Sequence, residues 1–257
     1  MLGKLLKYEA KATARTFIPI YIALLIVSAI NRVFRMNNIE MGFTLSVLVI
    51  VGLFIALGVI TLIMIIQRFS KNLLSDEGYL MFTLPVKISD LILSKLIISF
   101  LWTVISGIVA ILAILILLGD ATFFSQIKEL ITVANWNYFL EGIRQEFGGN
   151  PIFFIVEVPI ISLCMYINTV LMIYLSISVG QLPIFNKHRV LFSFITYFII
   201  TTVGQWAIMI IGNIIDYSGF SISSNMGLNL ITIGCIAVDI ALFMIINFIL
   251  KKHLNLE

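Results

Sequence analysis

The feature that most constrains this chain is an uninterrupted apolar run, Met41–Ile66, which contains no charged residue. As an α-helix rising 1.5 Å per residue, the run would be about 39 Å long. A helix that crosses a bilayer needs about 20 apolar residues. The run therefore predicts a transmembrane helix with length to spare.

Five further apolar runs have the same character, although the fourth of the six contains Glu157 and Pro159. These runs are Phe17–Ile30, Leu96–Leu118, Pro151–Gly180, Val190–Ile211 and Met226–Leu250. Only 11% of the residues are charged and 61% are hydrophobic, whereas soluble domains are about a quarter charged. We therefore expect an all-α polytopic membrane protein, in which residues 1–257 form one domain with six transmembrane helices.

The distribution of basic residues predicts the orientation of the spans. An even number of spans places both termini on one side of the membrane. If that side is the cytoplasm, four of the 16 Lys and Arg residues lie outside, namely Arg32, Arg35, Lys128 and Arg144, and the other twelve lie inside. The positive-inside rule favours this arrangement, with both termini cytoplasmic at the cell membrane. The formal net charge of +3 is too small to indicate a nucleic-acid partner.

Residues 67–95, between the second and third runs, combine charge with apolar surface. The charged residues are Arg68, Lys71, Asp76, Glu77, Lys87, Asp90 and Lys95, and the apolar ones include Leu73, Leu74, Tyr79, Leu80, Met81, Phe82 and Leu84. We expect so charged a segment to lie in water at the cytoplasmic face. An apolar patch rimmed by charge typically marks a contact with another protein.

The local chemistry of this loop predicts a short helix of about two turns. Ser75 is a suitable N-cap, and Asp76 and Glu77 follow it in the first turn, where carboxylates favour the positive end of the helix dipole. Pro85 cannot continue that helix.

Tyr79 and Phe82 stand three residues apart and would share one face of the short helix. Beyond Pro85, Ser89 is a second plausible N-cap, and Asp90 follows it at the start of the next long apolar helix.

The N-terminal residues 1–16 place Lys4, Lys7, Lys11 and Arg15 at helical spacings among leucines. This pattern indicates a short amphipathic helix that lies on the lipid at the cytoplasmic surface. The alternative is the basic region of a signal peptide, but no small-residue cleavage site follows, and Arg32 and Arg35 come too soon.

The loop 119–150 is the largest segment expected outside the cell. Ile127, Leu130, Ile131 and Ala134 recur in it at helical spacing. We expect part of this loop to be an amphipathic helix at the membrane interface.

Two carboxyl groups fall within the apolar runs, Glu157 in the fourth and Asp239 in the sixth. Ionisable groups at such depth are costly and normally face the bundle interior or a water-filled path. One interpretation is a contact with a substrate or a gate. The other is a hydrogen bond that holds helices in register, with Asn168, Gln205 or Asn247 as partners. Both remain open for Asp239, whereas Glu157, shallower and beside Pro159, favours the second.

The sequence contains no motif that would make the chain an enzyme. It has no GxxxxGK[ST] for binding ATP, and neither HExxH nor GxSxG for hydrolysis. His188 and His253 both lie beside lysines in segments expected to be cytoplasmic, which favours surface residues over metal ligands. Cys164 and Cys235 lie in apolar runs and indicate no disulfide framework.

The order of these parts, together with the loop sequence EGYLMFTLPVKISDLILSK, resembles the permease subunit of an ABC-2 type exporter from a Gram-positive bacterium. Such permeases often read EGYL, then TLPV, then a later serine–lysine pair. The resemblance implies that Asp76, Glu77, Gly78, Tyr79, Leu80, Met81, Phe82 and Leu84 belong to a coupling helix. That helix would seat in a groove of a separate nucleotide-binding ATPase subunit.

The resemblance also implies that ATP and Mg²⁺ are held by that partner subunit and that this chain carries no cofactor. The chain would form half of a pore with a second copy or a homologue. It is similar to exporters of amphipathic cytolytic peptides, the phenol-soluble modulins, and lantibiotic immunity permeases look alike. The alternative is a membrane anchor or sensor that transports nothing and recruits a cytosolic protein through residues 67–95.

Overall fold

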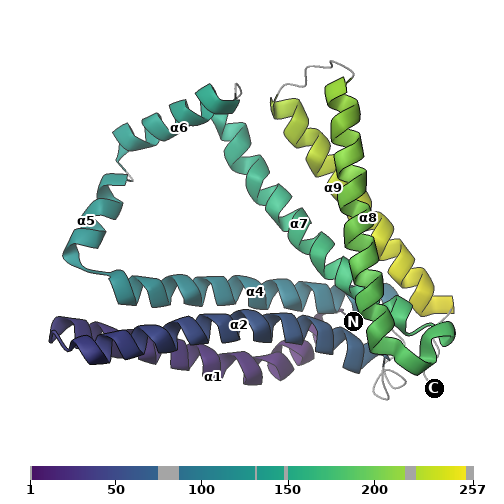
Figure 1. Ribbon diagram of the computed structural model, residues 1–257, viewed down its shortest axis with the longest axis horizontal. Coiled ribbons are helices and arrows are strands. Elements are labelled where there is room, and N and C mark those ends of the chain that lie inside the picture. The colour runs from purple at the N-terminus through teal and green to yellow at the C-terminus, as the bar shows by residue number, and fades with distance from the viewer. Residues whose placement is uncertain (1, 75–86, 131, 148–149, 218–223, 253–257) are drawn as a thin grey trace. The chain divides into compact units, whose positions relative to one another are not determined.

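The computed structural model describes residues 2–74, 87–130, 132–147, 150–217 and 224–252, and helices dominate all five stretches (Figure 1). The helices are α1 (Leu2–Met36), α2 (Glu40–Leu74), α4 (Ile88–Leu118), α5 (Ala121–Leu130), α6 (Val133–Phe147), α7 (Pro151–Gly180), α8 (Arg189–Tyr217) and α9 (Ser224–Lys252), with a 3-10 helix η1 (Pro183–His188) between α7 and α8.

Six of these helices, α1, α2, α4, α7, α8 and α9, are long and apolar enough to cross a membrane. They coincide with the six runs predicted from the sequence, and no strand occurs in the described part of the chain. The protein is an all-α polytopic membrane protein, as predicted.

The helices divide into two compact units. The first contains α1, α4, α5 and nearly all of α2, and the second contains α6 to α9. The core of the first unit is aromatic: Phe17 of α1 stacks on Trp102 of α4 with ring centroids 4.9 Å apart, and Tyr21 packs beside both. Ile50 and Leu57 of α2 complete this core.

Helices α1 and α4 run parallel in a constant register. Three side-chain contacts join them at residues separated by 86, 85 and 87 positions: Glu9 with Lys95, Tyr21 with Ser106 (2.7 Å), and Arg32 with the carbonyl oxygen of Gly119 (3.1 Å). Because the separation hardly changes from one end to the other, the two helices stay side by side over most of their length.

Helix α2 runs antiparallel to α1 after a tight turn. Asn38 in that turn has a φ of 55°, a left-handed conformation that asparagine tolerates better than most residues. The Asn31 amide donates to the Ser46 hydroxyl (2.6 Å) and to the carbonyl oxygen of Phe43 (3.2 Å). At the opposite end, Arg68 of α2 approaches Glu9 of α1. Polar contacts therefore tie the first unit together at both ends.

The spacing of these polar ends matches a bilayer. Glu9 and Asn31 lie about 33 Å apart along α1 at 1.5 Å per residue, and the hydrocarbon core of a bilayer is about 30 Å thick. The apolar core around Phe17 and Trp102 lies between them along the helices. This unit accordingly has a polar contact near each edge of the lipid, and its middle is apolar apart from the hydrogen bond between Tyr21 and Ser106.

Two of the arginines assigned to the less basic side cap a helix end. Arg32 donates to the carbonyl oxygen of Gly119, and Arg35 donates to that of Leu117 (3.2 Å) and pairs with Asp120. The last carbonyl groups of a helix have no partner within the helix and carry its negative dipole end. Both arginines donate hydrogen bonds to carbonyl groups at the C-terminal end of α4, and these bonds account for their position.

In the second unit, α7 packs against both α8 and α9. Its C-terminal half is buried on several sides, with Tyr174 and Val170 each 1% exposed. Gly180 ends the helix where α8 begins, and a Cβ atom there would lie 2.6 Å from the carbonyl oxygen of Arg189. The close approach of α7 and α8 at this point requires a glycine.

The N-terminal residues differ from the prediction. They do not form a separate interfacial helix, because α1 continues without a break from Leu2 to Met36. Pro19 lies inside this helix, and Glu9 and Thr13 are buried. The prediction of a separate N-terminal helix was wrong, because residues 1–16 continue into the first span as one helix and Glu9 pairs with Lys95 of α4.

The central loop is shorter than predicted. Helix α2 continues to Leu74, and α4 begins at Ile88 with Lys87 as its N-cap, so Ser89 is a helical residue and not the predicted cap. The predicted coupling helix, from Asp76 to Leu84, with its signals Ser75 and Pro85, lies outside the described residues.

The loop 119–150 contains two helices, where one was predicted around Ile127, Leu130, Ile131 and Ala134. Helix α5 ends at Leu130 and α6 begins at Val133, so the predicted residues are divided between them, and Ile131 lies outside the described residues.

We predict that Gly180→Ala lowers the stability of the second unit. The added methyl group would overlap the Arg189 carbonyl oxygen, and forcing extra atoms into a packed site typically costs about 1–3 kcal/mol. The measurement is the midpoint of thermal unfolding of the purified protein in detergent. Gly204→Ala and Gly234→Ala are matched controls because no atom lies within 4 Å of their new Cβ. A midpoint for Gly180→Ala as high as theirs would contradict the close approach.

Candidate functional site

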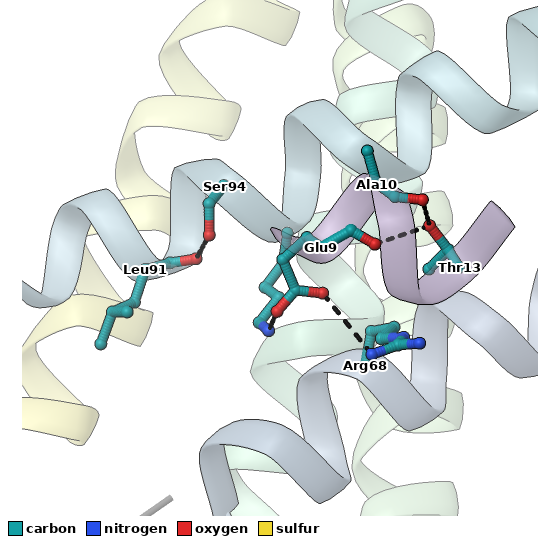
Figure 2. A network of polar contacts seen from close by, with 7 residues as sticks. Glu9, Ala10, Thr13, Arg68, Leu91 and Ser94 are labelled. Atoms are coloured by element: carbon teal, nitrogen blue, oxygen red, sulfur yellow. Dashed lines mark hydrogen bonds and ion pairs between the residues drawn. The ribbon is translucent and has the colours of Figure 1, made fainter. Parts of the chain in front are cut away.

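A buried charge cluster joins the three membrane helices of the first unit. Its members are Glu9 of α1, Lys95 of α4 and Arg68 of α2, and we call it the Glu9 cluster. The Lys95 ammonium donates to Glu9 Oε1, and the Arg68 guanidinium lies 3.8 Å from Glu9 Oε2. Figure 2 shows the Glu9 carboxyl group turned toward Arg68.

The central pair of the cluster is almost fully withdrawn from solvent. The side chain of Lys95 is 1% exposed and that of Glu9 is 6% exposed, whereas Arg68 keeps 24%. A buried charge is tolerated only when it is paired, and removal of one partner leaves the other uncompensated. The cluster therefore fixes the positions of α1 and α4 relative to each other, with Arg68 at its more open side.

Hydroxyl groups stabilise the backbone around the cluster. The Thr13 hydroxyl donates to the carbonyl oxygen of Glu9 (2.8 Å) and approaches that of Ala10 (3.1 Å), while the Ser94 hydroxyl donates to the carbonyl oxygen of Leu91 (2.7 Å) (Figure 2). These bonds lie within one turn of the ion pair on each helix. They satisfy hydroxyl groups that are themselves buried.

The cluster lies close in sequence to both ends of the predicted coupling helix. Arg68 stands about 9 Å along α2 from its end at Leu74, and Lys95 stands about 10 Å along α4 from its start at Ile88. Both helices that flank residues 75–86 are thus tied to the same carboxyl group of α1. A displacement of that segment would act on α1 as well as on α2 and α4.

Sequence reasoning placed Lys95 wrongly and missed Glu9. Lys95 was expected in an aqueous loop, but it is buried in α4, because the opposite charge of Glu9 allows a lysine to sit among apolar residues. Glu9 is the only acidic residue in the basic stretch 1–16. That isolated carboxylate was the signal that could have found the cluster.

The two carboxyl groups of the second unit lie in the interface of α7 and α9, which we call the α7–α9 seam. The Asn168 amide donates to Asp239 Oδ1 (3.0 Å), and the Thr232 hydroxyl donates to Glu157 Oε1 (2.7 Å). Both Asp239 and Glu157 are buried. Residue numbers rise together on the two helices, so α7 and α9 run parallel.

These contacts favour the structural interpretation of both carboxyl groups. Asn168 is one of the partners expected for Asp239, whereas Glu157 bonds Thr232, which was not among those expected. Each carboxyl group accepts a hydrogen bond from the facing helix and so helps to hold the register. A role of either residue in a transport pathway stays a prediction.

The two cysteines flank the same hydrogen bond of the seam. Cys164 and Cys235 each precede a member of the Asn168–Asp239 pair by one turn. Both are free thiols. Within the described ranges, no group of three or more His, Cys, Asp or Glu residues could hold a metal ion.

Comparison with known proteins finds no family model, no curated protein and no solved structure that matches the chain.

We predict that breaking the Glu9 cluster destabilises the first unit in a non-additive way. Lys95→Met removes the nearest opposite charge from the buried Glu9 carboxylate and should lower the free energy of unfolding by about 3–5 kcal/mol. Glu9→Leu with Lys95→Met removes both charges and should lower it less than Lys95→Met alone. The measurement is the free energy of unfolding of the purified protein in mixed micelles.

Asp120→Asn is the matched control, because it removes the partner of Arg35 from an ion pair whose side chains are 31% and 50% exposed. Such a pair contributes at most about 1 kcal/mol. If Lys95→Met cost no more than Asp120→Asn, the ion pair would not hold α1 to α4.

We predict that Cys164 and Cys235 can be joined by a short bifunctional thiol reagent in the membrane, because each lies one turn before a member of the bonded Asn168–Asp239 pair of the α7–α9 seam. The measurement is the mass of the linked peptide pair after proteolysis. Moving the thiol of α9 by one residue, with Cys235→Ser and Ile236→Cys, is the control. Ile236 lies on a more exposed face of α9, and equal linkage through that position would contradict the register.

Proposed function

We propose that this chain is the transmembrane permease subunit of an ATP-driven exporter, in which residues 75–86 dock onto a separate ATPase. The six apolar spans provide the membrane part, and the sequence has no motif for binding ATP. The energy for transport would come from a partner that holds ATP and Mg²⁺.

The Glu9 cluster is the observation that supports this proposal most directly. A segment that served only as a tether would not need the helices before and after it to be joined by an ion-pair cluster. Here Arg68 and Lys95, on the helices before and after the segment, meet at one carboxyl group on α1. A displacement of residues 75–86 would therefore move α1, α2 and α4 together.

The constant register of α1 with α4 explains how such a displacement could be transmitted to the opposite face of the membrane. The contacts of α1 with α4 keep one register from Glu9 to Arg32, and packed helices transmit displacement because they do not deform continuously. Closure of the ATPase at one face would tilt the unit and change its spacing from the second copy or homologue that completes the pore.

The proposed class of substrate rests on the resemblance to ABC-2 type permeases and on the apolar character of the chain. Amphipathic or antimicrobial-type peptides, or other hydrophobic substrates, could enter laterally from lipid. The α7–α9 seam offers polar groups at membrane depth, at Glu157 and Asp239. Both would be available to the polar side of such a substrate if the helices separate.

We predict that Tyr79→Ala with Phe82→Ala abolishes binding of the ATPase and export while leaving insertion intact. Truncating central aromatic residues of a protein interface often costs 2 kcal/mol or more, which is about thirtyfold in affinity. The measurement is co-purification of the proposed ATPase partner, together with its rate of ATP hydrolysis, at matched permease expression.

Tyr79→Phe with Phe82→Leu is the matched control, since it keeps apolar surface at both positions and should retain binding. If the double alanine variant still held the ATPase and exported at the normal rate, residues 75–86 would not be the coupling element. Binding of a cytosolic partner with no hydrolysis and no transport would favour the membrane anchor.

A further inference from the structure

Helix α6 exposes an apolar face that no part of the second unit covers. Val133, Trp136 and Phe139 are 77%, 49% and 52% exposed. They stand three residues apart and so lie along one side of the helix. The rings of Trp136 and Phe139 contact each other, with centroids 5.4 Å apart.

The opposite side of α6 is polar. Asn137, Glu141 and Gln145 are exposed and lie about 100° or more from the centre of the aromatic face, and the exposed Tyr138 lies among them with its hydroxyl group as a polar end. A helix with these two faces is amphipathic and must either pack its apolar side on protein or place it in lipid.

The attachment of α6 to α7 sets its depth. α6 packs against α7 within the second unit, and Ile143 is its buried residue. Only a short link separates Phe147 from the start of α7, where the Asn150 side chain accepts a hydrogen bond from the backbone of Ile152 (3.1 Å). α7 crosses the membrane and α6 leaves it in a different direction (Figure 1). α6 therefore lies where α7 enters the lipid.

The charge of α6 argues against an electrostatic partner. The sequence of α6 has two acidic residues, Glu141 and Glu146, and one basic residue, Arg144, so the helix carries no excess of positive charge. Helices that bind anionic surfaces are rich in Lys and Arg on the polar side. Tryptophan, in contrast, is enriched at membrane–water interfaces whatever the lipid charge. Apolar insertion is the interaction that this composition fits.

We propose that the Val133–Trp136–Phe139 face of α6 inserts into the bilayer interface of the leaflet in which α7 begins. Its occupant is the boundary between headgroups and acyl chains of ordinary phospholipid, and the attachment does not need anionic lipid. The face thereby anchors the segment between α5 and α7 flat against the membrane. This inference does not depend on the proposed transport function.

The test is quenching of Trp136 fluorescence in the full-length protein reconstituted into phosphatidylcholine vesicles. The Trp136 signal is the difference between the unchanged protein and Trp136→Phe, which leaves Trp102 and Trp206 in place. Vesicles with bromine near the top of the acyl chains should remove most of that signal, and aqueous acrylamide should remove little. Adding phosphatidylglycerol or salt should change neither result.

Three results would overturn the proposal. Strong quenching by acrylamide with none by brominated lipid would place the face in water. Protection from both quenchers would mean that protein covers it, either a second copy or another partner. Lipid quenching that appears only with phosphatidylglycerol would make the attachment electrostatic. Tyr138→Phe, a change on the opposite side of α6, should leave the quenching pattern unaltered.

Discussion

The first unit depends on one carboxyl group that is buried near the edge of the membrane. Glu9 accepts the Lys95 ammonium from α4 and faces the Arg68 guanidinium from α2, so three helices meet at one residue. Neither Lys95 nor Glu9 could be buried alone at tolerable cost. Their pairing forces α1 and α4 into parallel contact, and the aromatic packing of Phe17 on Trp102 then follows from that register.

Parallel helices carry polar contacts in both units, α1 with α4 and α7 with α9. In the first unit the antiparallel pair α1 and α2 also exchanges polar contacts, at Asn31 with Ser46 and at Glu9 with Arg68. The polar contacts of the first unit lie mainly near the lipid edges, whereas in the second unit Asp239 and Asn168 bond well inside their helices.

The proposed coupling and the proposed lipid anchor rest on different units. The Glu9 cluster of the first unit joins the helices before and after residues 75–86, and in the second unit α6 lies at the start of α7 with aromatic side chains exposed. The first proposal concerns a soluble partner and the second concerns lipid.

The sequence alone determined the class and the number of spans, because runs such as Met41–Ile66 are too long and too apolar to be accommodated in any other way. It also named Asn168 among three candidate partners for the buried carboxyl groups, and Asn168 bonds Asp239. Only the tertiary structure decided that Lys95 is buried, that Glu9 is its partner, and that residues 1–16 continue the first helix. The physical reason is that a charged residue such as Lys95 is expected in water when only its neighbours in the sequence are considered. Whether it can be buried depends on an opposite charge 86 residues away.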